Sequence, residues 1–201
     1  AVAVLGGPSH AAGVLERGAS VVLASLDDGF ARQLADVLQT AKLDVTITND
    51  VTGVELAGCA KNAAAAAGAG PNVAGAAAGK VFAEVDALAR ARGGQPESFS
   101  GLAGAGDLVA TVVASGSRNR QAGELLAQGM PAEEIATALG HAAEAVDSVP
   151  LLATAARNAR LQSPALDGLA ALVEGRIEPE RWTETVTQPT TRSRKRPVRA
   201  A

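Results

Sequence analysis

The sequence predicts a mainly α-helical protein, in which a helical C-terminal domain follows a partial α/β segment. Strand-like and helix-like segments alternate over residues 1–50, and helical periodicity then continues without a further strand pattern. Hydrophobic residues make up 47% of the 201 residues, which is enough for a sizeable core, whereas aromatic residues make up only 2%. The core must therefore consist of Ala, Val and Leu, and such small side chains allow helices to approach closely.

The first fifty residues account for the α/β part. Runs of β-branched and apolar residues predict three strands, at 1–5, 19–25 and 43–50. The segment 6–18 is a turn with a helical tendency, in which Pro8 suits a first helical position. Apolar residues at helical spacing predict a second helix within 27–41. The alternation of strand and helix therefore predicts part of an α/β sheet.

From residue 51 onward the pattern is helical. The predicted helices cover 52–68, 72–92, 106–114, 118–128, 131–139, 144–159 and 164–174. The breaks between them are rich in glycine. After Trp182 the sequence contains Thr, Pro and Arg with little periodicity, which predicts a disordered basic tail. The predicted organisation is thus an incomplete first domain at 1–50, a helical domain at 51–182 and the tail at 183–201.

The charge distribution and the cysteine content exclude several classes of protein. Residues 191–200 carry five basic side chains, and removing five of the 18 basic residues leaves 13 against 21 acidic residues. The body therefore lacks the basic footprint of a nucleic-acid-binding domain, and no apolar run is long enough for a membrane span. The single cysteine, Cys59, excludes an internal disulfide and fits a reducing compartment. With His10 and His141 far away in sequence, it gives no metal-binding spacing.

Lys61 is the first candidate for chemistry. It lies among alanines in "VELAGCAKNAAAAA", so a helix packed inside a cleft would partly desolvate its ammonium group. Desolvation disfavours the charged form, which suits a general acid or base. The alternative is that Lys61 extends to water, as most helical lysines do, and the pattern alone favours this alternative. Asn62 beside it either orients a hydroxyl or carbonyl group or caps a turn.

Asp107 is the second candidate. It follows "GLAGAG" and precedes "LVATVV", at a position where a helix N-cap is expected. The functional alternative is a carboxylate that orients a lysine and accepts a hydrogen bond from a substrate hydroxyl group. Thr111 would then lie one turn later on the same face of the helix. Taken alone, the segment favours the N-cap.

Two further segments indicate a small anionic ligand. The stretch "SGSRNR" places Ser117, Arg118 and Asn119 at the start of a helix, where N–H groups bind phosphate and arginine adds a matching fork. An exposed, capped helix with solvated arginines is the alternative. The stretch "GGPSHA" is either a tight turn whose backbone faces a cofactor or an ordinary strand-to-helix connection.

The order of these motifs is more specific than any one of them. From about residue 2 to 175, "GGPS", "GVELAG" with "KN", "GLAGAGDLVAT" with "SRNR", and "AAEAV" follow one another, and in this order they resemble the bacterial NAD(P)-dependent glycerol-3-phosphate dehydrogenases. The resemblance implies a helical C-terminal dehydrogenase domain after the last strands of a Rossmann-type nucleotide-binding domain. It also implies interconversion of dihydroxyacetone phosphate and sn-glycerol 3-phosphate with NAD or NADP, in the cytoplasm, for phospholipid precursor synthesis.

The resemblance further implies a role for each motif residue. Lys61 is implied as the proton donor and acceptor. Substrate contacts are implied for Lys61 and for Gly7, Ser9, Asn62, Asp107, Thr111, Ser117, Arg118 and Asn119, the last three at the phosphate. Cofactor contacts are implied for Ala11, Arg118, Ala142 and Glu144. The implied partners are a phosphorylated triose and a second copy of the chain, and we expect neither a metal, a nucleic acid nor a membrane span.

The sequence also departs from the family's pattern. The G-x-G-x-x-[GA] fingerprint that seats a pyrophosphate is absent, so we expect the sequence to begin inside a domain and the 201-residue chain alone to be inactive. The segment Gly68–Lys80 is about seven residues shorter than in the family, a change that loop ends tolerate. His10 replaces a usual Phe, and Gly13 falls close to a usually acidic position.

Two other functions stay open at this point. One is a truncated or degenerate relative without catalysis that serves as a helical dimerisation module. The other is a dehydrogenase of hydroxy acids, with which the Ser-Arg-Asn phosphate motif conflicts.

Overall fold

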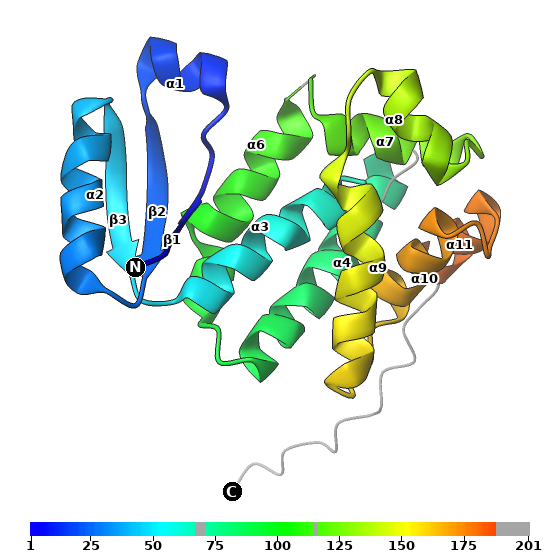
Figure 1. The fold of residues 1–201 in the computed structure, drawn as a ribbon. Helices are drawn as coiled ribbons and strands as arrows, with labels where there is room; N and C mark the ends of the chain where they lie inside the picture. Colours follow the sequence, from blue (N-terminus) through cyan, green and yellow to red (C-terminus); the bar gives the residue numbers. More distant parts are fainter. Residues whose placement is uncertain (67–70, 115, 188–201) are drawn as a thin grey trace, which may run out of the picture.

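A small sheet with its helices lies at one side of the molecule, and a helical domain forms the rest (Figure 1). This computed structural model describes residues 1–66, 71–114 and 116–187. The arrangement confirms the predicted fold class, which is mainly α-helical with a partial α/β segment at the start. Among the described residues after 50, all regular structure is helical, as predicted.

Three strands form one sheet, and in spatial order they are β1 (Ala3–Gly6), β2 (Ala19–Ser25) and β3 (Leu43–Thr48). β1 runs antiparallel to β2, whereas β2 and β3 are parallel and are connected by helix α2 (Asp28–Thr40). Leu23 of β2 forms a small cluster with Ala31 and Ala35 of that helix. The next residue, Ala24, has its side chain on the opposite face of the sheet and joins the core of the helical domain. The sheet is therefore fixed to the helical domain through its second face.

The first helix begins later than predicted. Helix α1 covers Ala11–Arg17, so Pro8 is not its first residue. Gly7 has a φ of 112°, and the Ser9 hydroxyl donates a hydrogen bond to the Gly7 carbonyl at 3.1 Å. A Cβ at Gly7 would lie 3.2 Å from the backbone of β2, so this turn needs glycine both for its φ and for its close approach. The turn occupies the residues that were expected to start the helix.

In the helical domain, several helices pack around one central helix, α3 (Val51–Ala65). The other elements of the domain are α4 (Pro71–Ala91), α5 (Pro96–Ser100), a π-helical segment (Leu102–Gly106), α6 (Asp107–Val113), α7 (Arg118–Ala127), α8 (Ala132–Leu139), α9 (Glu144–Asn158), α10 (Pro164–Val173) and α11 (Pro179–Thr187). α3 contacts α4, α6, α7 and α9 as well as β1, so it connects the sheet with most of the domain (Figure 1).

Small residues bring these helices close together. Ala57, Ala60 and Ala63 of α3 are fully buried in the main core. At the end of α3, a Cβ on Gly123 of α7 would lie 2.4 Å from the carbonyl oxygen of Ala66, so the two backbones nearly touch. This close packing is what the low aromatic content predicted.

The C-terminal part of the chain differs from the prediction. The basic tail was expected from residue 183, but α11 continues through Thr187. Trp182 and Val186, one turn apart, are both buried and anchor this helix to the domain. Residues 188–201, the rest of the predicted tail, and residues 67–70, in the predicted short segment, lie outside the described part of the chain.

Taken singly, none of the described helices has the length and apolar character needed to cross a membrane. Only the bent pair Pro96–Val113 and Arg118–Ala127 reaches that length and composition when its two members are counted together.

Candidate active site

Lys61 and Asp107 form an ion pair although they are 46 positions apart in sequence. The Lys61 Nζ atom lies 2.7 Å from Asp107 Oδ2, and the exposed fractions of the two side chains are 24% and 7%. Lys61 lies in the last part of α3 and Asp107 is the first residue of α6, and these two helices pack against each other. A mostly buried pair of this kind holds a cation at a fixed place with partial access to water.

Asp107 is not an N-cap, contrary to the interpretation that its segment alone favoured. The π-helical segment runs directly into α6, so the residue before Asp107 is already helical and no side chain caps this helix start. Gly104 makes the segment possible, because a Cβ there would lie 2.2 Å from the carbonyl oxygen of Phe99. The carboxylate is therefore available to pair with Lys61. Wider helical turns of this type are frequent at functional sites.

Asn62 and Thr111 are polar residues close in sequence to the two members of the ion pair. Asn62 follows Lys61 and is partly buried, and Thr111 is buried one turn after Asp107. Neither side chain forms a hydrogen bond with another described residue. An amide and a hydroxyl group of this kind can serve a polar ligand.

The turn Gly7–Ser9 lies next to the same place. A Cβ built on Gly106, the residue before Asp107, would lie 3.8 Å from Pro8 Cδ. A Cβ on Gly6 would likewise lie 3.3 Å from Ala103 in the π-helical segment. The end of β1 therefore adjoins the segment that leads into Asp107, which brings the first and third predicted motifs together.

The start of α7 holds a second group of predicted residues. The Ser117 hydroxyl caps the helix by accepting from the N–H of Arg120 at 3.4 Å. Arg118 forms an ion pair with Glu144, the first residue of α9, and both side chains are about half exposed, at 49% and 47%. Asn119 is buried and bridges the same two helices. Its Nδ2 donates to Glu144 Oε2 at 3.2 Å, and its Oδ1 accepts from the N–H of Ala145 at 2.9 Å.

The charged residues predicted for the site thus fall into two groups rather than one, Lys61 with Asp107 and Arg118 with Glu144. No hydrogen bond or ion pair between described residues links Arg118 to Lys61 or Asp107. α3 connects the two groups, because it packs against both α6 and α7. Ala142 is exposed in the loop before α9, close in sequence to Glu144. Ala11 is the first residue of α1, and its side chain lies outside the described part of the structure.

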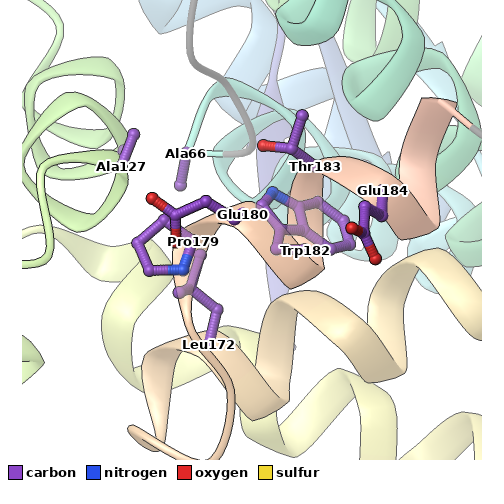
Figure 2. A pocket seen from close by; sticks show the side chains of 9 residues that line it. Ala66, Ala127, Leu172, Pro179, Glu180, Trp182, Thr183 and Glu184 are labelled. Carbon is purple, nitrogen blue, oxygen red and sulfur yellow. The ribbon is translucent and has the colours of Figure 1, made fainter.

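Two cavities are lined by other residues. Figure 2 shows one of about 340 Å³, to which Leu172, Pro179 and Trp182 contribute at the junction of α10 and α11. Another, of about 870 Å³, lies between α4, α6 and α7 and is mostly apolar. Neither contains a predicted site residue. In the described ranges, no group of His, Cys, Asp and Glu side chains is arranged to hold a metal ion.

Sequence reasoning missed one buried acid, at the opposite end of α3 from Lys61. Asp50 is the N-cap of α3 and accepts three hydrogen bonds, including one from the N–H of Gly53 at 2.8 Å. The signal was present, because an Asp three residues before a Gly at a strand-to-helix boundary is typical of an N-cap. The hydrogen bonds that Asp50 accepts from Gln95 and Ser98 could not be predicted from the local sequence, because these residues lie 45 and 48 positions later.

The fold and the site together define a class of structure: a helical domain attached to an α/β sheet, with a lysine–aspartate pair close to their junction. Residues 50–184 match the family described as NAD-dependent glycerol-3-phosphate dehydrogenase C-terminus. The chain belongs to this family, which confirms the resemblance found in the motifs.

Relatives with known names agree with this assignment. Glycerol-3-phosphate dehydrogenase (NAD(P)+) 1 of Salinibacter ruber is 36% identical over 180 residues, which are 86% of this chain and 53% of that protein. The crystal structure of glycerol-3-phosphate dehydrogenase from Coxiella burnetii is 30% identical with a TM-score of 0.83, covering 90% of this chain and 58% of that one. The Plasmodium falciparum enzyme, at 14% identity, a TM-score of 0.81 and coverage of 94% and 57%, shares the fold. The chain spans about half the length of the curated relatives it matches.

Proposed function

We propose that the whole protein interconverts dihydroxyacetone phosphate and sn-glycerol 3-phosphate with NAD or NADP, and that Lys61 donates and accepts the proton. The observation that carries this proposal is the 2.7 Å ion pair between Lys61 Nζ and Asp107 Oδ2. It fixes an ammonium group in a mostly buried place. Family membership and the names of the relatives support the substrate and cofactor classes.

Lys61 acts on the oxygen of the substrate carbonyl group. As that group is reduced, negative charge grows on its oxygen, and an ammonium group aimed at it neutralises the charge and donates a proton. In the reverse direction the neutral amine accepts the proton of the substrate hydroxyl group. Asp107 holds the amine in position throughout, and Asn62 and Thr111 bind the substrate's hydroxyl oxygens. The nicotinamide cofactor, when bound, supplies or accepts the hydride.

The substrate phosphate binds at the start of α7. The first N–H groups of a helix attract an anion, and the Arg118 guanidinium offers a matching pair of donors. Glu144 occupies that guanidinium in the structure, so a phosphate has to compete with a half-exposed carboxylate. The Asn119 side chain already uses both its polar atoms on α9, so its contribution to phosphate binding comes through its backbone N–H.

Gly7 and Ser9 contact the substrate from the turn after β1. This turn packs closely on β2, because a Cβ on Gly7 would lie 3.2 Å from that strand. The nicotinamide cofactor contacts residues at the starts of α7 and α9. Glu144 can accept hydrogen bonds from sugar hydroxyl groups, and Ala142 lies just before it in the chain. Ala11 and Arg118 complete the cofactor contacts.

The remaining features of the proposal concern the whole protein. Residues 1–50 are the last part of its nucleotide-binding domain, the substrate domain runs from residue 51 through the end of α11, and its active form is a homodimer. It acts in the cytoplasm in phospholipid precursor synthesis, a compartment that fits the free thiol of Cys59.

The proposal is tested by turnover of the whole protein. NADH and NADPH oxidation is measured with dihydroxyacetone phosphate, for the unaltered protein and for Lys61→Ala. We expect turnover in the unaltered protein and a loss on the order of 10²–10⁴-fold in the variant, the usual contribution of a proton-transfer group. Arg92→Ala, which removes an exposed cation after α4, is the matched control. Absence of turnover in a folded whole protein would support the non-catalytic module instead, and full activity of Lys61→Ala would refute the role of Lys61.

A further inference from the structure

We infer that Asp50 is a positioning residue for the proton transfer, because it fixes the helix that carries Lys61 to the segment that carries Asp107. The inference rests on the proposed function of those two residues. Asp50 lies at the beginning of α3, eleven positions before Lys61, and its side chain is buried. It touches neither substrate nor reacting atoms.

Asp50 uses its two carboxylate oxygens on two different elements. Oδ1 accepts from the N–H of Gly53 at 2.8 Å, which caps α3. Oδ2 accepts from the N–H of Gln95 at 2.9 Å and from the Ser98 hydroxyl at 2.6 Å, both at the start of α5. A carboxylate can accept from all three donors at once, whereas a hydroxyl group in its place could cap α3 but could not reach α5.

The connection from α5 to Asp107 is short and tightly packed. α5 ends at Ser100, the π-helical segment begins at Leu102, and Asp107 follows it directly. Within this stretch, Phe99 is buried and its ring packs edge-on against Phe82 of α4, with ring centroids 5.2 Å apart. The approach of Gly104 to the Phe99 carbonyl oxygen leaves no space for a side chain. A displacement of α5 is therefore passed on to Asp107 with little loss.

The connection from Asp50 to Lys61 is a single helix. Lys61 lies about 15 Å along α3 from its first residue, at 1.5 Å per residue, so a tilt of about 4° at the base moves it by about 1 Å. The fit at the base is close, because a Cβ on Gly53 would lie 1.8 Å from Asp50 Oδ2. One buried carboxylate thus sets the relative position of the two partners in the ion pair.

The test uses the whole protein with Asp50→Ser, which keeps a hydroxyl cap for α3 but loses both bonds to α5. We expect kcat to fall roughly ten- to a hundredfold, as misplacement by about 1 Å does, while KM for dihydroxyacetone phosphate is unchanged. The pH profile of kcat should shift as well, because Lys61 and Asp107 no longer hold their mutual distance. Ser98→Ala removes one of the two bonds, and it should give a smaller loss in the same direction.

A purely structural role for Asp50 predicts a different result. Ser163→Ala is the stability control, because it removes the bond that the buried Ser163 hydroxyl donates to Asp167 at 3.2 Å, near the start of α10. If Asp50→Ser and Ser98→Ala lowered Tm as this control does but left kcat and its pH profile unchanged, the inference would be overturned. Lys61→Ala in the same assay distinguishes failure of this inference from failure of the proposed function, since its activity reports on the proposed function alone.

Discussion

The ion pairs Lys61–Asp107 and Arg118–Glu144 join groups of the same kind in opposite surroundings. The first lies between two packed helices, with side-chain exposures of 24% and 7%. The second lies at two helix starts, with exposures of 49% and 47%. Burial strengthens a charge pair and fixes its geometry, whereas water weakens an exposed pair and allows exchange of partners.

Under the proposed function, this difference matches the role of each pair. A proton donor must stay at a fixed distance from the reacting oxygen, so Lys61 keeps the same partner throughout. A phosphate-binding arginine must exchange its partner whenever substrate enters or leaves, and a half-exposed carboxylate is easily displaced. Replacement of a residue in the buried pair should therefore act on kcat, and replacement in the exposed pair should act on KM.

The largest effect that would sharpen this contrast is expected from Asp107→Asn. The amide keeps the shape of the carboxylate but leaves the Lys61 ammonium without its charged partner, so kcat should fall roughly a hundredfold with little change in KM. The matched control is Asp86→Asn, which breaks the Arg90–Asp86 pair on the surface of α4. Steady-state kinetics give kcat and KM of both variants. Equal kcat values for Asp107→Asn and Asp86→Asn would show that the buried pair has no special role in turnover.

Arg118→Ala tests the exposed pair. One charge-assisted hydrogen bond contributes about 1.5–3 kcal/mol, so KM for dihydroxyacetone phosphate should rise roughly ten- to a hundredfold while kcat changes less. Arg120→Ala on the same helix is the neighbouring control, because Arg120 pairs with Glu124 within α7. If kcat fell and KM stayed constant, the two pairs would not differ in the way described above.

A change in ionic strength should affect the two ion pairs differently, and we expect this effect to be smaller than that of the substitutions. Raising the ionic strength from about 0.05 to about 0.5 M screens exposed charges strongly and buried ones weakly. KM for the phosphorylated substrate should therefore rise a few-fold, and kcat at saturating substrate should remain nearly constant. Kinetics along a sodium chloride series measure both, and a parallel fall of kcat would show that the Lys61–Asp107 pair is as screened as the other.

The smallest expected effect concerns a partly buried carboxyl group outside the site, that of Glu84. Burial raises the pKa of Glu84, although the N–H groups of Ala165 and Leu166, at 3.0 and 2.7 Å, act in the opposite direction. A raised folded-state pKa means that this contribution to stability is present below the ordinary value and is lost as pH rises through the folded-state value.

The comparison with Glu84→Gln isolates that contribution. The free energy of unfolding of the unaltered protein, relative to the variant, should decrease with rising pH above the ordinary Glu value, by less than about 1 kcal/mol after solvent screening. Urea unfolding at a series of pH values measures the difference. A difference that increased with pH would mean that the backbone N–H groups of Ala165 and Leu166 dominate.

Local patterns were sufficient for most of the fold. Apolar spacing predicted α3, α4 and α6 to α10, since helices of an alanine-rich core repeat their buried face regularly. The short α5, the π-helical segment and α11 were not predicted. The order of the motifs also predicted the family. The end of the helical domain at 182 was wrong, because Trp182 and Val186 bury one face of a helix that continues to Thr187.

The errors at the site have a tertiary cause. The local sequence around Asp107 favours an N-cap, and only the arrival of Lys61 from α3 and the π-helical turn before it give the carboxylate another partner. Asn119 is similar, since its bonds to α9 depend on the packing of a helix 25 positions later. Pairings of this length are set by how the helices pack, which short-range spacing does not specify.

Under the proposed function, the close approach of Gly123 to Ala66 has a consequence for the relative position of Arg118 and Lys61. Gly123 lies one turn into α7 from Arg118, and any larger residue there would meet the end of α3, the helix that carries Lys61. The spacing of these two helices therefore depends on the absence of a side chain at this one position.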